Sequence, residues 1–545
     1  MDSVIANRHC RFPLRPLAAC LAVALSAAPL RADAVNDGRH TTASVASQGE
    51  SMMHGARGAG KAFAARAGSV PRAPTTVVVT NCDDSGPGSL RDTVAAAVSG
   101  DTVDMSALTC STITLTSGAI VIPVDDLTLL GPGQDALAID ADLNSHVLST
   151  NGSIEISDLT LTHGYRGPRG ACLYAAGNAE LTRVTVQACF ADNMYSDDPS
   201  PYAGGGVFVG GNLTMTSSTL QNNGVKHCSA CGFDAATRTV AGDIQQGHGP
   251  ITRPIAAAGG GAYVGGDATI TASTITFNSS AGGFYGYSAV GGGLAVHGHL
   301  TVLDSTLASN WTIYIVGYGA GRGPSTGGAN RFPGLVEIGG GLYLYPGATL
   351  SMNGSTVASN SAGLGAGGGI FGAMATATIM NSTLSGNSGE GAGLVIGSMQ
   401  MMNSTVADND AYHDATGGVI VLGDSEIESS IIARNQGDGA ADLSSDGAPV
   451  TISGANNLIM DVDPSVAVPP DTLHADPLLA ALADNGGPTW TMALLPHSPA
   501  IDVGNDVALL ATDQRGPGYP RVVGANADIG AYEVMVDVIF ADGFD

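Results

Sequence analysis

Residues 339–360 read GGGLYLYPGATLSMNGSTVASN, and this phrase decides the fold. It joins three glycines, an alternating apolar run, a Ser-Thr pair and a closing asparagine. Similar phrases start at Gly204, Gly259, Gly291 and Gly367, and weaker ones at Gly391 and Gly417. From the first glycine to the asparagine, each unit spans 19 to 22 residues. Self-similarity at one period predicts a stack of structural repeats.

Within each unit the apolar and polar residues alternate, as in Thr269-Ile270-Thr271. A period of two is typical of a strand with one buried face. Glycines and asparagines punctuate these strands, because both residue types accept the backbone geometry of tight corners. A constant unit length then predicts an all-β parallel β-helix whose rungs lie about 4.8 Å apart.

The closing asparagines are expected to lie above one another at one corner of the coil. Stacked carboxamides donate and accept hydrogen bonds along the stack, so we predict a structural amide ladder, with ligand binding as the alternative. The ladder residues are Asn223, Asn278, Asn310, Asn360, Asn387, Asn409 and Asn435.

The N-terminal 34 residues have the features of a secretory signal peptide. Three arginines precede an apolar run from Leu17, and small residues end at Ala34. A lipoprotein signal is the alternative, because Cys20 follows Leu17-Ala18-Ala19, but most of the apolar run lies after that cysteine. Residues 35–74, rich in Ala, Gly and Ser, predict a linker.

The remaining composition narrows the class of partner. The net charge is −27, and Lys61 and Lys226 are the only lysines. Nucleic-acid binding needs clustered Lys and Arg, so a nucleic-acid partner is not expected. No later run of apolar residues is long enough for a transmembrane helix, so none is expected in the mature chain.

Both ends of a parallel coil expose unpaired strand edges that need covers. At the N-terminal end, Ser89 is placed as the N-cap of a short helix that carries Leu90, Val94 and Val98 on one face. This helix follows a strand at Thr76–Thr80 and is predicted to plug the open coil.

The order of this strand, the helix, GDTVDMS and STITLTSGAIVIP, followed by the triple-glycine units, resembles bacterial secreted right-handed β-helix proteins of pectate-lyase-like architecture. The resemblance covers residues 75–460 and implies a right-handed solenoid.

Residues 461–533 contain DNGGPTWTMALLPHSPAIDVGN and DQRGPGYPRVVGANADIGAYE. These motifs resemble the choice-of-anchor Q module, which implies an irregular C-terminal cap on a secreted or surface-sorted protein and no particular reaction. The acids around Arg515 are interpreted as a partly buried ion-pair network rather than a catalytic pair. The tail at 534–545 ends VIFADGFD and resembles a sorting signal of Gram-negative secreted proteins.

Six cysteines follow the predicted signal peptide, an even count that suits an oxidising compartment. Cys172 and Cys189 take repeat positions that would meet at one corner, which predicts a disulfide closing one rung. Cys228 and Cys231 predict a local disulfide, with zinc binding alongside His227 as the alternative. The remaining disulfide candidates are Cys82 and Cys110, which lie on either side of the predicted N-terminal capping segment.

Insertions in the repeat all leave from the corner after the asparagine, so the four longest, 190–203, 224–258, 279–290 and 311–338, should cluster on one side. Aromatic rings beside polar groups suit sugar rings, so a glycan-binding groove is one hypothesis. The alternative is that these rings only pack the loops onto the coil. The binding candidates are Tyr195, Tyr202, Tyr285, Tyr287, Trp311, Tyr314, Tyr318 and Arg322.

Catalytic motifs are sparse. Asp197, Asp198 and His248 resemble part of the site of pectin-hydrolysing β-helix enzymes, but the acids are adjacent and the companion motifs are missing. No cofactor is predicted; calcium on the Asp-rich loops is the one candidate, although no ordered calcium loop occurs.

We therefore expect an exported, surface-associated or secreted, non-catalytic β-helix protein of a Gram-negative bacterium. Its expected partners are a polysaccharide or a cell-surface glycan and the export and sorting machinery of the cell. A polysaccharide hydrolase or lyase is the first alternative. A purely structural or self-associating passenger is the second.

Overall fold

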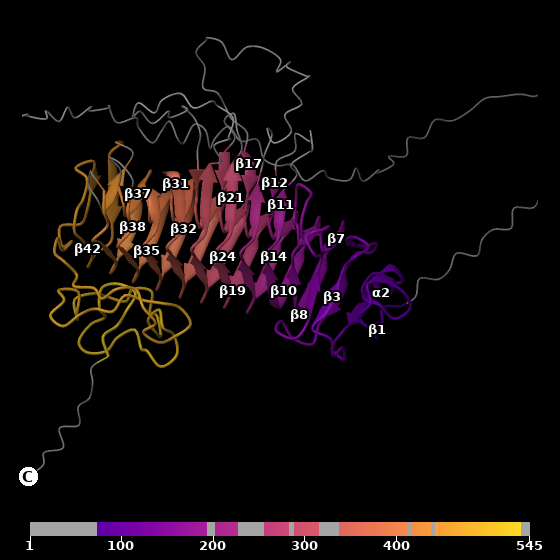
Figure 1. Ribbon diagram of the computed structural model, residues 1–545. Helices are drawn as coiled ribbons and strands as arrows, with labels where there is room; N and C mark the ends of the chain where they lie inside the picture. The colour runs from indigo at the N-terminus through magenta and orange to yellow at the C-terminus, as the bar shows by residue number, and fades with distance from the viewer. Residues whose placement is uncertain are drawn as a thin grey trace, which may run out of the picture.

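The computed structural model describes residues 73–192, 202–226, 255–282, 288–314, 337–411, 416–437, 442–445 and 447–535. Over these residues the chain winds into a long coil of short strands, and every pairing between named strands is parallel (Figure 1). Most turns contribute three strands, which align with their counterparts in the next turn to build three parallel sheets. The protein is thus a right-handed parallel β-helix, which confirms the predicted fold class.

The coil strands are β1(Thr76–Val78), β2(Thr102–Asp104), β3(Thr112–Thr114), β4(Ile120–Ile122), β5(Leu127–Leu130), β6(Ala138–Asp140), β7(Leu148–Thr150), β8(Ile154–Thr162), β9(Leu173–Ala175), β10(Ala179–Gln187), β13(Val207–Val209), β14(Leu213–Thr216), β15(Thr219–Gln221), β18(Ala262–Val264), β19(Ala268–Thr271), β20(Thr274–Thr276), β23(Leu294–Val296), β24(His299–Leu303), β25(Thr306–Ala308), β28(Leu342–Leu344), β29(Thr349–Asn353), β30(Thr356–Ala358), β32(Ile370–Met380), β33(Thr383–Ser385), β35(Leu394–Met402), β36(Thr405–Ala407), β37(Val419–Val421), β38(Ser425–Glu428), β39(Ile431–Ala433), β40(Leu443–Ser445), β41(Val450–Ser453), β42(Leu458–Ile459) and β43(Val466–Ala467).

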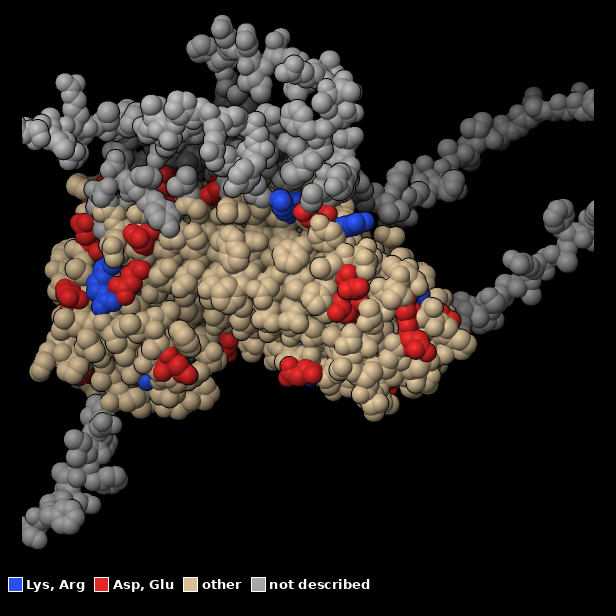
Figure 2. Space-filling model, viewed as in Figure 1, with Lys and Arg blue, Asp and Glu red and all other residues tan. Residues whose placement is uncertain are grey.

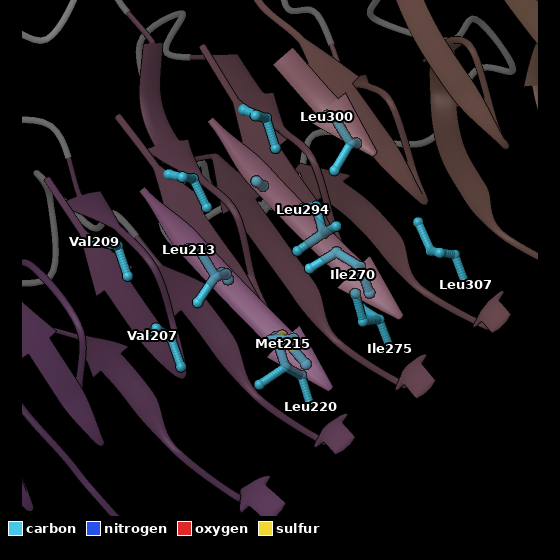
Figure 3. Close-up of a cluster of buried hydrophobic side chains, with 14 of the residues drawn as sticks. Val207, Val209, Leu213, Met215, Leu220, Ile270, Ile275, Leu294, Leu300 and Leu307 are labelled. Carbon is cyan, nitrogen blue, oxygen red and sulfur yellow. The ribbon is translucent and has the colours of Figure 1, made fainter. Parts of the chain in front are cut away.

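Alternation along each strand fills the coil with aliphatic side chains. In β14, Leu213 and Met215 are buried, whereas Thr214 and Thr216 between them face outward. Figure 3 shows such residues from successive rungs, including Ile270 and Leu300, pointing into the same interior. Because each rung adds the same apolar set, the core is a continuous column rather than a central cluster.

The repeat asparagines form a buried hydrogen-bonded ladder. In the six from Asn223 to Asn409 the side-chain amide donates to the Oδ1 atom of the asparagine in the next rung, at 2.8 to 3.0 Å. The backbone N–H donates to the same oxygen, as from Asn278 to Asn310. The second amide hydrogen reaches a carbonyl of the preceding rung, as from Asn310 to Ile275. Each carboxamide is therefore fully used inside the structure, between Asn223 and Asn435.

The two ends of this ladder are built from other residue types. At the N-terminal end the backbone N–H of Cys189 donates to Oδ1 of Asn223. At the other end, Oδ1 of Asp442 accepts both the amide and the backbone N–H of Asn435. The sequence analysis did not include Asp442, which ends the ladder because a carboxylate accepts hydrogen bonds and has none to pass on.

A second ladder uses the serines of the Ser-Thr pairs and Ser430, which takes the same position in the rung after Ser404. The backbone N–H of each serine donates to the hydroxyl oxygen of the next, for example from Ser273 to Ser305 at 3.0 Å. Several of these hydroxyls donate to a carbonyl two residues earlier, as Ser305 does to Leu303. The ladder ends on the Asn457 side chain. Its serines are Ser218, Ser273, Ser305, Ser355, Ser382, Ser404 and Ser430.

Helix α2(Leu90–Ala95) lies beside β1 at the N-terminal end of the coil (Figure 1). Ser89 caps it, accepting the Asp92 backbone N–H, and Leu90 and Val94 are fully buried. The helix ends before Val98, so Ala97 is the buried residue that follows it. Arg91 ties the helix to the coil by donating to the carbonyls of Gly118 and Ala119. A plugging role for this helix stays a prediction.

Two disulfides are present among the described residues, Cys82–Cys110 and Cys172–Cys189. The second joins the two repeat positions that the sequence analysis paired, and it closes the rung just before the asparagine ladder begins. Cys228 and Cys231 lie outside the described residues, as does His227.

The residues after β43 fold back along the side of the coil instead of extending it (Figure 1). Within the described range their backbone makes only isolated bridges, one parallel, from Leu473 to Leu458, and the others antiparallel, such as Thr512 to Pro520. Gln514 binds the threonines of two rungs, donating to Thr356 and accepting from Thr383. Asn381 and Asn403, at the corners of two successive rungs, donate to carbonyls of this segment. The C-terminal residues thus clamp several rungs together.

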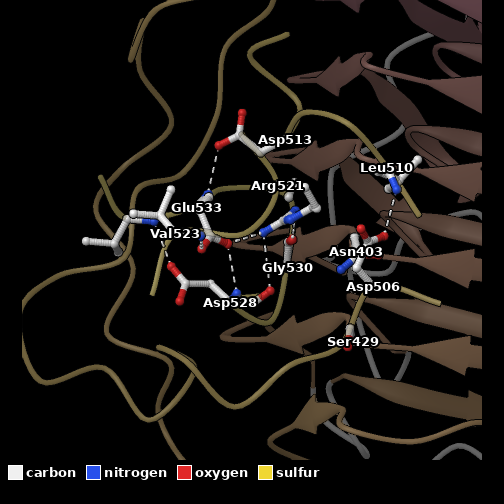
Figure 4. A network of polar contacts seen from close by, with 12 residues as sticks. Asn403, Ser429, Asp506, Leu510, Asp513, Arg521, Val523, Asp528, Gly530 and Glu533 are labelled. Carbon is white, nitrogen blue, oxygen red and sulfur yellow. Dashed lines mark hydrogen bonds and ion pairs between the residues drawn. The ribbon is translucent and has the colours of Figure 1, made fainter. Parts of the chain in front are cut away.

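Buried ion pairs hold this irregular segment in shape. Arg515 pairs with Asp513 at 2.6 Å, and Arg521 pairs with Glu533 at 2.9 Å, with all four side chains inaccessible or nearly so. Arg521 also donates to the Gly530 carbonyl, and Glu533 accepts the Asp528 backbone N–H (Figure 4). This arrangement matches the ion-pair interpretation of these acids. In the described part of the chain, no helix is long and apolar enough to cross a membrane.

Removing one amide from the asparagine ladder should cost the protein much of its stability. Asn310→Ala leaves the backbone N–H and one amide hydrogen of Asn278 buried without partners, and each orphaned group costs about 1–3 kcal/mol. We expect a loss of about 3 kcal/mol or more in the free energy of unfolding, measured by chemical denaturation. Thr306→Ala, on the outward face of the same rung, is the control; an equal loss in both variants would contradict the ladder's role.

Asp442 should make stability fall as pH rises. Burial raises the pKa of this carboxyl to about 6, above its usual value near 3.8. The folded state thus favours the protonated form, so its stabilising effect is complete below pH 4 and lost as pH rises through 6. Relative to Asp442→Asn, which does not titrate, wild-type protein should lose about 3 kcal/mol between pH 4 and pH 7. Unfolding measured across that range tests this; a pH-independent difference between the two proteins would refute it.

Candidate functional site

Most of the predicted binding and catalytic residues lie outside the described residues. These are Tyr195, Asp197, Asp198, His248, Tyr285, Tyr287, Tyr318 and Arg322. Of the remaining binding candidates, Tyr314 is described by its backbone alone, at the end of a strand. Tyr202 and Trp311 are described in full and have opposite environments.

Tyr202 is not available as a binding ring. Only 2% of it is exposed, and it packs in the main hydrophobic core beside Ala191 and Ala257. Its position near the end of the insertion at 190–203 suggested a loop. However, the strand that leads back to the coil already begins at Tyr202. This corrects the predicted role of Tyr202: its ring fills the core.

The insertions begin and end as strands that form a second sheet, here called the ledge. After the asparagine corner the outgoing strands are β11(Phe190–Asp192), β16(Gly224–Lys226), β21(Ser279–Gly282) and β26(Trp311–Tyr314). The returning strands are β12(Tyr202–Ala203), β17(Ile255–Ala258), β22(Ser288–Val290) and β27(Glu337–Ile338). β31(Ser361–Ala366) joins the two series in one strand and pairs with β34(Ser388–Glu390). The ledge strands gather along one long side of the coil (Figure 1).

Alternation divides the outgoing strands into an inner and an outer face. Ala191, Val225, Ser280 and Thr312 are buried in register with one another. Phe190 and Trp311, one residue earlier in their strands, are 41% and 38% exposed. The outer face of the ledge therefore presents aromatic rings to solvent.

One row of this outer face runs through successive rungs and is here called the ledge row. Its members each follow the corner residue of a rung and pair in parallel register. They are Tyr165, Phe190, Gly224, Ser279, Trp311, Ser361, Ser388, Asp410 and Gln436. Phe190 and Trp311 stand three rungs apart, about 14 Å at the usual strand spacing. Gly224 and Ser279 form the low floor between them.

Gly224 is required for this floor because Phe190 leans over it. A Cβ atom at Gly224 would lie 3.0 Å from Cδ1 of Phe190 and 3.1 Å from the Ser279 hydroxyl. Any larger residue would push the ring of Phe190 away. The absence of a side chain at Gly224, which is buried, therefore lets the Phe190 ring lie flat along this part of the ledge.

Charged groups stand beside the aromatic rings at the N-terminal end of the ledge. Asp192 and Lys226 face the same side as Phe190 and are register partners. Burial raises the pKa of the Asp192 carboxyl, and the Lys226 ammonium partly offsets this effect. Arg166 stacks over the Tyr165 ring at 5.9 Å. Elsewhere on the visible face the acidic residues lie in small separate groups (Figure 2).

A third ladder, of aromatic rings, holds the ledge to the coil. Tyr174, Phe208 and Tyr263 stack in successive rungs, with ring centroids 5.2 and 5.1 Å apart. Tyr343 and Phe371 continue the stack beyond Ala295. With Ala203, Ala258, Val290 and Ile338 of the returning strands they form a hydrophobic cluster separate from the coil core. This ladder was not predicted from the sequence, although each ring occupies the same position of its repeat, shortly after the glycines.

His297 interrupts the aromatic ladder with a polar group. Its Nε2 atom lies 2.9 Å from the Tyr263 hydroxyl, and its ring stacks on Tyr345. Burial lowers the pKa of His297 to about 4. The imidazole is therefore neutral near pH 7, and its Nε2 atom shares a hydrogen bond with the Tyr263 hydroxyl. The Tyr345 hydroxyl is buried without a hydrogen-bond partner.

One groove lies on the coil itself, away from the ledge. It has a volume of ≈ 590 Å³ and crosses β32, β35, β38 and β41. Thr378, Gln400 and Glu426 line it with hydroxyl, amide and carboxylate groups, and no aromatic ring takes part. Across the described residues, no three potential metal ligands of the His, Cys, Asp or Glu type come together.

Comparison with known proteins gives weak likenesses. No protein-family model matches the chain, and no curated protein matches it. Among solved structures, it is similar to the pectate lyase Pel9A, with 13% identity, a TM-score of 0.32 and coverage of 85% of this chain and 97% of that chain. It is also similar to ORF18 of Geobacillus virus E2, with 10% identity, a TM-score of 0.26 and coverage of 72% and 59%.

Both likenesses concern the fold alone. The β-helix assignment rests on the parallel register of the strands, and the choice-of-anchor Q resemblance of residues 461–533 stays a prediction.

His297 should give the aromatic ladder a pH dependence opposite in sign to that of Asp442. Its lowered pKa means that folding favours the neutral ring, so its stabilising effect is complete above pH 6.5 and lost as pH falls toward 4. His297→Gln, which does not titrate, should remove this loss. Unfolding of both proteins between pH 7 and pH 4 checks the prediction, which fails if the wild type and the variant change in parallel.

Proposed function

We propose that this protein is an exported β-helix protein that binds glycans on the outer face of its ledge, without cleaving them. The single observation that carries the proposal is the pair of exposed rings, Phe190 and Trp311, in one register row over a floor of Gly224 and Ser279. Soluble proteins seldom leave large rings open in such an order, and aromatic faces stack on the apolar faces of sugars.

The polar neighbours of the rings suit the same ligand class. Ser279 and Ser361 offer hydroxyls beside the rings, and Asp192 and Lys226 add charged groups at one end. Sugar hydroxyls need such donors and acceptors when a glycan loses its water. The ledge therefore combines stacking surfaces with hydrogen-bonding groups, as a glycan-binding surface requires.

Export to an oxidising compartment is part of the proposal. The signal-like N-terminus and the tail at 534–545 suggest secretion or display on the surface of a Gram-negative bacterium, and two disulfides suit that environment. The choice-of-anchor Q resemblance of the C-terminal segment suggests the same. An adhesin-like role, holding the cell to a polysaccharide or to a glycan-coated surface, follows from this location.

Trp311 provides the direct test, because the chain has only two tryptophans, Trp311 and Trp490. In Trp490→Phe, intrinsic fluorescence reports Trp311 alone. This signal and affinity electrophoresis can be used to screen pectic, alginate, β-glucan and glycosaminoglycan chains. We expect at least one of them to bind. Trp311→Ala should weaken that binding at least about tenfold, equivalent to 1.4 kcal/mol.

Trp490→Ala is the matched control, since Trp490 is also exposed but lies in the C-terminal segment. It should bind like the wild type. Equal losses in the two variants, or no retention on any glycan, would refute the proposal. New reducing ends or unsaturated products during incubation would instead identify a polysaccharide-degrading enzyme.

A further inference from the structure

The ledge row is longer than the two rings that suggest binding. It continues in register from Tyr165 to Gln436, so each rung except that of Gly224 contributes one side chain to the same side. Adjacent parallel strands lie about 4.8 Å apart, so successive members of the row are separated by the same distance. A ligand that contacts several members must match the spacing and be nearly straight.

An extended β-1,4-linked pyranose chain has these properties. Each sugar in such a chain advances by about the length of one rung, and successive sugars turn their two flat faces alternately to the same side. Both faces carry C–H groups that stack on aromatic rings. An α-1,4-linked glucan coils, so it meets one ring of the row and turns away before the next.

The row divides into a stacking half and a polar half. Tyr165, Phe190 and Trp311 supply rings toward the N-terminal end. Beyond Trp311 the row offers only polar side chains, Ser361, Ser388, Asp410 and Gln436, of which the last two are exposed. Sugars that stack at one end would therefore exchange hydrogen bonds through their edges at the other. This order favours one chain lying along the coil axis over several separate sugars.

Resting on the proposed function, we infer that the ledge row binds an extended β-linked glycan parallel to the coil axis, one sugar for each rung. The sugars over Phe190 and Trp311 are three residues apart in the chain. Those between them pass over Gly224, which is buried and adds no side chain to the surface, and over the half-buried Ser279, whose hydroxyl can bind the sugars.

The test is a length series with the full-length mature protein carrying Trp490→Phe. Fluorescence titration compares β-1,4-glucan and chitin oligosaccharides, from disaccharide to hexasaccharide, with maltooligosaccharides of the same lengths. We expect affinity in a β-linked series to rise at least about tenfold once the oligomer spans both rings, at the tetrasaccharide. Maltooligosaccharides should show no such step.

Phe190→Ala should remove the step, so that the tetrasaccharide binds no more tightly than the disaccharide. Gly224→Val, which blocks the floor, is the second variant if Phe190→Ala folds poorly, and it should also remove the step. Phe277→Ala is the matched control, because this exposed ring precedes the Asn278 corner and lies off the row. The rise in affinity at the tetrasaccharide should persist in this control variant.

The outcomes separate the two claims. Binding that is independent of oligomer length, or equal steps in the α- and β-linked series, would overturn the axial arrangement while leaving glycan binding intact. Loss of the step in Phe277→Ala would also overturn it. If no oligosaccharide or polysaccharide binds, the proposed function itself fails.

Discussion

One buried carboxamide in each rung is the interaction on which the rest of the structure depends. At the corner where the chain turns from the coil, the backbone N–H of the asparagine is bound by a side chain and not by the backbone of the next rung. An unpaired buried polar group would cost about 1–3 kcal/mol. Asparagine resolves this by donating twice and accepting twice in one position, as Asn310 does between Asn278 and Asn360. The ledge strands leave from this fixed corner, so their register is inherited from the ladder.

The sequence was sufficient for the β-helix because its information is periodic. A triple glycine, an alternating run and an asparagine recur at nearly constant spacing. The alternating run indicates a strand with one buried face, and the glycines and the asparagine indicate tight corners. The serine ladder repeats just as regularly but was not predicted, because Ser and Thr in a strand usually indicate an outward face. Only the turn at corners such as Asp304, with a left-handed backbone, directs Ser305 inward. A one-dimensional pattern does not reveal that change of face.

The ledge was harder to foresee for a different reason. Residues that follow each asparagine differ from rung to rung, so Phe190 and Trp311 were assigned to loops. They pair all the same, since backbone hydrogen bonds between rungs do not depend on side-chain identity. Tyr202 was misjudged by the same reasoning, as its strand had already begun. Side-chain identity decides instead which residues face outward, and there the alternation of Trp311 and Thr312 is informative in retrospect.

The C-terminal clamp has a consequence for how such a chain can change its length over evolutionary time. Most rungs interact only with their two neighbours, so duplication of a whole rung would preserve every ladder upstream of Asn353. Downstream, the segment from Thr489 to Ala531 contacts the coil at fixed positions between Gly354 and Asn456. An extra rung inserted there would shift half of these contacts by one step and break the match. Growth by duplication is therefore open to the part of the coil before Gly354 and closed to its clamped end.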